Sequence, residues 1–132
     1  MKLELERNFK ASSEKIYNIW IDQSQISLWF GVDVEIEPKV GGKLRFIFDK
    51  EKDITTGVYK ELVPFSKVSF TWNSMCNGES TGETLVSVFI ESISDSTSKI
   101  RLEHSGFDNE KMKNTHIEGW MDYFGKWEEK LV

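Results

Sequence analysis

The chain has 132 residues, of which 39% are hydrophobic and 30% are charged, and its formal net charge at pH 7 is -5. This length is close to the commonest size of one domain, so we expect a single domain over residues 1–132. The negative charge and the lack of a basic stripe in the sequence argue against nucleic acid as a partner. No stretch of the sequence approaches transmembrane length, so membrane insertion is not expected either.

Two features of the sequence concern its cellular location. The N-terminal residues alternate charged side chains with leucine and lack the apolar run of a signal peptide. The single cysteine, Cys76, cannot form an internal disulfide, which fits a reducing compartment. We therefore expect a cytoplasmic protein.

Residues 2–10 alternate apolar and polar side chains, which predicts a half-buried first strand with Arg7 as the charged residue on its apolar face. Ser12 is a typical N-cap and predicts a short helix after this strand. A second short helix is expected over residues 24–30, because Gly31 is a typical residue at a helix end.

From Val32 onward the pattern changes to strands that follow one another directly. Turn and loop signals separate them: the diglycine at 41–42, a polar loop expected over 73–82 and a polar turn over 92–97. The six predicted strands cover residues 34–37, 43–49, 57–62, 68–72, 84–90 and 98–104.

The last segment switches to helical spacing, with bulky residues three and four apart after Asp108, a typical N-cap. This helix is expected to bury a stripe of rings against the sheet. The stripe consists of His116, Trp120, Tyr123, Phe124 and Trp127. One strand, two short helices, a run of strands and a long final helix predict an α+β fold with sequential antiparallel pairing.

Four stretches of the chain resemble the helix-grip, START-like superfamily known as SRPBCC, and within it the branch of the Hsp90 ATPase activator. They are Arg7–Ala11, Gly41–Phe46 after Trp29–Phe30, Gly57–Pro64 leading to Val68–Trp72, and His116–Trp120. The resemblance implies a curved antiparallel sheet of about seven strands wrapped around the C-terminal helix, with a cavity between them. Relatives include carriers, receptors, polyketide cyclases and co-chaperone domains, so the fold alone does not assign an activity.

Two histidines are expected to face the interior. His104 lies in phase with apolar neighbours on its strand, and His116 lies in phase with the rings of the last helix. Each is either a neutral core histidine bonded to a backbone carbonyl or a hydrogen-bond donor that orients a ligand. Two histidines without a nearby carboxylate or cysteine at ligand spacing do not predict a metal site.

Arg7 is the third polar residue expected on the inner face. A buried guanidinium keeps its charge and needs an acceptor. That acceptor is either a protein carboxylate, with Glu61 and Glu103 as candidates, or an acidic or keto group of a ligand. No activated nucleophile and no acid–base pair can be assembled from the sequence, so no catalytic residue is predicted.

These patterns favour a protein that binds a small hydrophobic or aromatic ligand between the sheet and the last helix, without a cofactor. One alternative is a co-chaperone-like protein-interaction module with a filled cavity, and another is a cyclase-like enzyme. A monomer or weak dimer is expected. The predicted ligand-binding residues are Arg7, Trp29, Phe46, Phe70, Trp72, His104, His116, Trp120, Tyr123 and Phe124.

Overall fold

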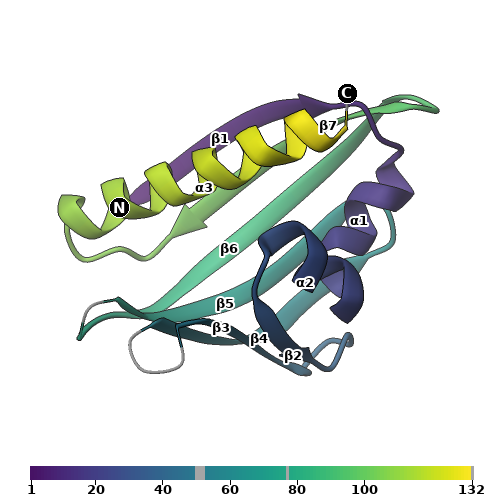
Figure 1. Cartoon of the computed structure of the whole chain (residues 1–132). Helices are drawn as coiled ribbons and strands as arrows, with labels where there is room; N and C mark the ends of the chain where they lie inside the picture. The colour runs from purple at the N-terminus through teal and green to yellow at the C-terminus, as the bar shows by residue number, and fades with distance from the viewer. Residues whose placement is uncertain (50–52, 77, 132) are drawn as a thin grey trace.

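Seven antiparallel strands form one curved sheet in the computed structural model, in the spatial order β1-β7-β6-β5-β4-β3-β2 (Figure 1). The structure describes residues 1–49, 53–76 and 78–131. The strands are β1 (Lys2–Phe9), β2 (Asp33–Ile36), β3 (Lys43–Asp49), β4 (Asp53–Val63), β5 (Lys67–Cys76), β6 (Glu79–Ser94) and β7 (Thr97–Ser105).

The long helix α3 (Glu110–Lys130) lies along one face of this sheet, and the short helices α1 (Ser13–Ile21) and α2 (Gln23–Phe30) lie beside it (Figure 1). This arrangement confirms the predicted α+β helix-grip architecture. The strands alternate accordingly, since every second residue of β7 from Ser98 to His104 is buried and the residues between them are more exposed. Among the described helices, none is both long and apolar enough to cross a membrane.

Local capping explains where the short helices begin and end. Ser12 caps α1 as predicted, because its hydroxyl accepts a hydrogen bond from the Lys15 amide at 3.2 Å. Asp22 separates the two helices, and its carboxylate accepts hydrogen bonds from the backbone amides of Ser24 and Gln25. Gly31 ends α2 with φ at 68°, a left-handed conformation that glycine adopts without strain.

The cap of α3 differs from the prediction by one residue. Asn109, and not Asp108, occupies the N-cap, and its side-chain oxygen accepts the amide of Met112 at 2.8 Å. Both residue types suit this position, so sequence alone could not choose between neighbours.

The hairpin between β5 and β6 is also longer than predicted. The segment expected as a loop over residues 73–82 is mostly strand, since Met75 pairs with Ser80 and Cys76 with Glu79. The polar composition of this segment predicted a loop. Polar side chains instead support the strand pairing, since the backbone amide of Ser74 donates a hydrogen bond to the hydroxyl of Thr81 at 2.9 Å. The polar turn expected over 92–97 is likewise shortened, because Ser94 and Thr97 already pair across it.

A glycine on β4 allows this strand to approach β5 closely. A Cβ on Gly57 would lie 1.8 Å from the carbonyl oxygen of Thr71, so no side chain fits there. The backbone amide of the next residue, Val58, donates a hydrogen bond to the side-chain hydroxyl of Thr71 at 2.9 Å. The register between β4 and β5 then shifts between Tyr59 and Glu61.

Candidate functional site

The interior between sheet and helices is filled for most of its length by contacting rings. Trp127, which is fully buried, lies 5.5 Å from the ring of Trp20, 5.4 Å from Phe30 and 5.3 Å from Phe124. Trp20 in turn lies 6.0 Å from Trp120. Such tilted and edge-on contacts pack this end of the fold as a core, which leaves little room for a ligand there.

A chain of hydrogen bonds joins α3 to three strands at the other end of the interior. The indole nitrogen of Trp120 donates to Nδ1 of His104 at 3.2 Å. Nε2 of His104 lies 2.8 Å from the hydroxyl of Thr84, which itself donates to the carbonyl of Trp72. His104 is therefore the tautomer with its proton on Nε2, and both of its nitrogens are satisfied within the protein.

The chain continues from Trp72 to the second histidine. Nδ1 of His116 lies 2.9 Å from the carbonyl of Met112, which can only accept, so Nδ1 carries the proton. Nε2 of His116 then accepts from the Trp72 indole at the long distance of 3.4 Å. This bonding to a backbone carbonyl is that of a neutral core histidine.

Burial determines the charge of both histidines. It lowers the pKa of His104 from 6.5 to about 2, with a smaller contribution from neighbouring His116. Burial also lowers the pKa of His116, although the bond to the Met112 carbonyl acts in the opposite direction. Both rings are neutral at pH 7. Within the described residues, no three histidine, cysteine or carboxylate side chains come together as metal ligands would.

An open cleft of about 190 Å³ lies beside this hydrogen-bonded chain, between α3 and strands β3 to β5. Its helical side contains Gly119, where a Cβ would meet nothing within 4 Å. The cleft therefore exists where α3 lacks a side chain. Its lining residues are Phe48, Asp53, Trp72, Ser74, Thr115, His116, Gly119, Trp120 and Tyr123.

Four of the ten residues predicted to bind a ligand line this cleft: Trp72, His116, Trp120 and Tyr123. Five others are buried elsewhere in the packed interior, namely Trp29, Phe46, Phe70, His104 and Phe124. The predicted stripe on α3 is buried except for Tyr123, which is half-buried at the cleft.

Arg7 lies away from the cleft. Its guanidinium forms an ion pair at 2.7 Å with Glu128 near the end of α3. The acceptor is thus a protein carboxylate, but neither Glu61 nor Glu103, which pair with Lys67 and Arg101. The pair joins the first strand to the last helix across 121 positions of sequence, a contact that alternation cannot reveal.

Sequence reasoning did not identify Phe48, Asp53, Ser74, Thr115 or Gly119 as lining residues. Gly119 offered a usable signal, because a glycine inside a helix lowers its stability by about 1 kcal/mol relative to alanine and so suggests a packing reason. It also lies three residues after His116 and four before Tyr123, on the same helix face.

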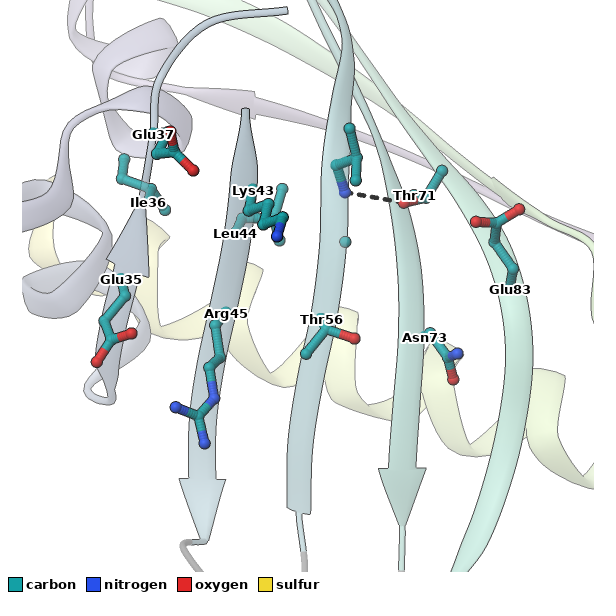
Figure 2. A pocket seen from close by; sticks show the side chains of 12 residues that line it. Glu35, Ile36, Glu37, Lys43, Leu44, Arg45, Thr56, Thr71, Asn73 and Glu83 are labelled. Atoms are coloured by element: carbon teal, nitrogen blue, oxygen red, sulfur yellow. Dashed lines mark hydrogen bonds between the residues drawn. The ribbon is translucent and has the colours of Figure 1, made fainter. Parts of the chain in front are cut away.

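The outer face of the sheet is hollowed over β2 to β6, with a volume of about 550 Å³ (Figure 2). The strand register aligns one polar residue from each of these strands in a row across the hollow. The row runs from Glu35 through Arg45, Thr56 and Asn73 to Glu83.

Charges on the two halves of this outer face behave differently. On the β1 and β7 half, Lys99 pairs with Glu6 at 3.3 Å. Arg101 there pairs with both Glu4 and Glu103. In the hollow, by contrast, none of the charged residues forms an ion pair with any residue that the structure describes. These residues are Glu35, Glu37, Lys43, Arg45 and Glu83.

A model of the family described as "Activator of Hsp90 ATPase homolog 1-like protein" matches residues 10–131. The chain belongs to this family. The match covers the cleft, the hydrogen-bonded histidines and the whole of α3. A search of curated protein sequences found no match. Family and fold together describe a ligand-binding or co-chaperone-like module.

Solved structures share this fold at low sequence identity. Protein MLL2253 from Mesorhizobium loti superposes with a TM-score of 0.84 at 20% identity, over 98% of this chain and 95% of that one. PFC0360w, an Hsp90 activator from Plasmodium falciparum, gives 0.75 at 18% identity, over 92% and 89% of the two chains. The Aha1 dimer from Colwellia psychrerythraea, solved in solution, gives 0.75 at 19% identity, over 99% and 96%.

Proposed function

We propose that this protein binds a small, flat and largely apolar molecule in the cleft beside Gly119. The observation that carries the proposal is the missing side chain at Gly119, which leaves open space beside the contacting rings of Phe48, Trp72 and Trp120. Aromatic walls with a few polar groups are typical of small-molecule sites.

The volume limits the size of the ligand. Sites for drug-sized molecules usually measure about 300–1,000 Å³, and this cleft has about 190 Å³. An apolar cavity of about 150 Å³ suffices to bind benzene. A molecule of one or two rings therefore fits, whereas a long lipid would have to displace the packed core.

Filling the cleft from the helix is expected to abolish binding. In Gly119→Leu the new side chain enters the open space, so the affinity for a bicyclic probe such as naphthalene should fall at least about tenfold. Titrations of naphthalene, followed by tryptophan fluorescence and by amide shifts, measure the change, because Trp72 and Trp120 line the cleft.

Gly125→Leu is the matched control. Gly125 lies on the same helix and also has open space around a Cβ, but it is not among the residues that line the cleft. Both substitutions add the same side chain and raise helix propensity alike. Equal binding by the two variants would place the ligand outside the cleft, and no response of the wild-type tryptophans up to about 1 mM would refute the proposal.

A second candidate function is docking of an Hsp90-type chaperone through the outer hollow. The family match supports this partner. The charges of the hollow, which form no ion pair with any described residue, supply a surface that a protein of complementary charge could neutralise. Lys43 and Arg45 would receive carboxylates of the chaperone, while Glu35 and Glu37 would receive its basic side chains. Interfaces of this kind gain specificity and association rate from matched charges.

Reversing the two cations of the hollow should weaken this docking. The double variant Lys43→Glu with Arg45→Glu is expected to reduce any stimulation of an Hsp90 ATPase by about tenfold or more at low salt. Lys99→Glu with Arg101→Glu makes the same change in net charge on the other half of the face and should leave the stimulation nearly intact. Loss of stimulation in both variants would show a general charge effect, and an ATPase rate unaffected by the wild-type protein would exclude this function.

A further inference from the structure

Resting on the proposed ligand site, we infer that the cleft selects neutral aromatic hydrogen-bond donors, such as phenols, and that Nε2 of His116 accepts the hydrogen bond. The protein group that recognises the ligand is thus an acceptor without charge. Aromatic carboxylates, which cannot donate, are the corresponding disfavoured class.

A hydrogen bond between His116 and the backbone of its own helix decides which ring nitrogen donates and which accepts. Nδ1 of His116 lies 2.9 Å from the carbonyl oxygen of Met112, and this contact requires a proton on Nδ1. Burial lowers the pKa of His116, so the ring holds no second proton at neutral pH. Nε2 therefore carries a lone pair and can only accept.

The hydrogen bond that Nε2 of His116 now accepts, from the indole of Trp72, is long and therefore weak. The indole nitrogen of Trp72 lies 3.4 Å from Nε2 of His116, whereas a hydroxyl donor approaches to about 2.7–2.8 Å. His116 and Trp72 both line the cleft, so a ligand hydroxyl seated there would take the place of the indole as the donor to this nitrogen. His104 cannot serve, because its two nitrogens are held by Trp120 and Thr84 inside the core.

A second polar group of the cleft, the hydroxyl of Thr115, agrees with this selection. The hydroxyl of Thr115 donates to the Lys111 carbonyl at 2.9 Å, so its oxygen presents lone pairs outward. Acceptors favour a neutral donor over a carboxylate, which has no proton to give them.

A series of three bicyclic probes tests the inference: 2-naphthol, naphthalene and 2-naphthoate. They share one ring system and differ in the polar group, so differences in affinity report on that group alone. We expect 2-naphthol to bind about tenfold more tightly than naphthalene, and 2-naphthoate to bind more weakly than both. In His116→Phe the advantage of 2-naphthol over naphthalene should vanish, because phenylalanine keeps an aromatic ring and removes the acceptor.

A spectroscopic measurement on the unaltered protein guards against a variant that fails to fold. The nitrogen resonance of His116 Nε2 should shift when 2-naphthol is added and should remain in place with naphthalene. Equal affinity for 2-naphthol and naphthalene, or tightest binding of 2-naphthoate, overturns the inference and leaves the proposed ligand site standing. Failure of all three probes to bind overturns both.

Discussion

Replacing Trp127 by alanine is expected to lower the free energy of unfolding by about 3–5 kcal/mol. Trp127 is fully buried and its ring contacts the rings of Phe9, Trp29 and Phe30, which belong to β1 and α2. Its indole nitrogen also donates to the carbonyl of Trp29 at 2.9 Å. The truncation leaves a large cavity and an unpaired buried carbonyl at the point where α3 meets the first strand and the short helices.

Urea unfolding followed by circular dichroism measures this loss. Trp127→Phe is a milder change, since it keeps an aromatic ring and removes the hydrogen bond and part of the indole volume, for an expected loss of about 1–3 kcal/mol. Met121→Ala on the exposed side of the same helix should change stability by less than about 0.5 kcal/mol. A loss below about 1 kcal/mol for Trp127→Ala would mean that α3 does not hold the fold together.

Periodicity predicted the frame of this fold well because burial acts on every second residue of a strand and on every third or fourth residue of a helix. Ile100, Leu102 and His104 fall on the inner face of β7 as the alternation required. The stripe through His116 and Trp120 faces the sheet for the same reason. These are local properties that each segment carries in its own sequence.

The cleft could not be predicted in the same way, because it depends on which rings meet across the interior. Phe46 and Trp72 both point inward from the sheet and contact at 5.5 Å, yet only Trp72 lines the cleft. What separates filled from open space is the side chain missing at Gly119, opposite these strands. The spacing of apolar residues in the sequence places each side chain on one face of its helix or strand. It does not determine which residue of another element that side chain contacts.

Lowering the pH below about 6.5 is expected to destabilise the fold, because both histidines are buried as neutral rings. Burial, and next the neighbouring His116, lower the pKa of His104 to about 2, while burial lowers that of His116. A proton on Nδ1 of His104 would face the N–H of Trp120 at 3.2 Å, so the folded state rejects it. The unfolded chain takes up these protons near pH 6.5.

The sign follows from these depressed values: the stabilisation is complete above about pH 6.5 and is lost as the pH falls toward the folded-state values. Each histidine that stays neutral contributes a slope of about 1.36 kcal/mol per pH unit. Between pH 6.5 and 5, His104 should therefore account for a loss of about 1.6 kcal/mol, because the slope has only half its full value at pH 6.5. Urea-unfolding curves across this interval measure the slope before most carboxylates begin to take up protons.

His104→Gln isolates this contribution. An amide can still accept from the Trp120 indole and donate to the Thr84 hydroxyl, the two bonds that His104 makes, but it does not titrate. We expect the variant to be somewhat less stable at pH 7 and to lose on average about 1 kcal/mol less per pH unit between pH 6.5 and 5 than the wild type. Parallel slopes for the two proteins would contradict the assignment, because they would mean that His104 is already protonated in the fold or stays neutral in the unfolded chain.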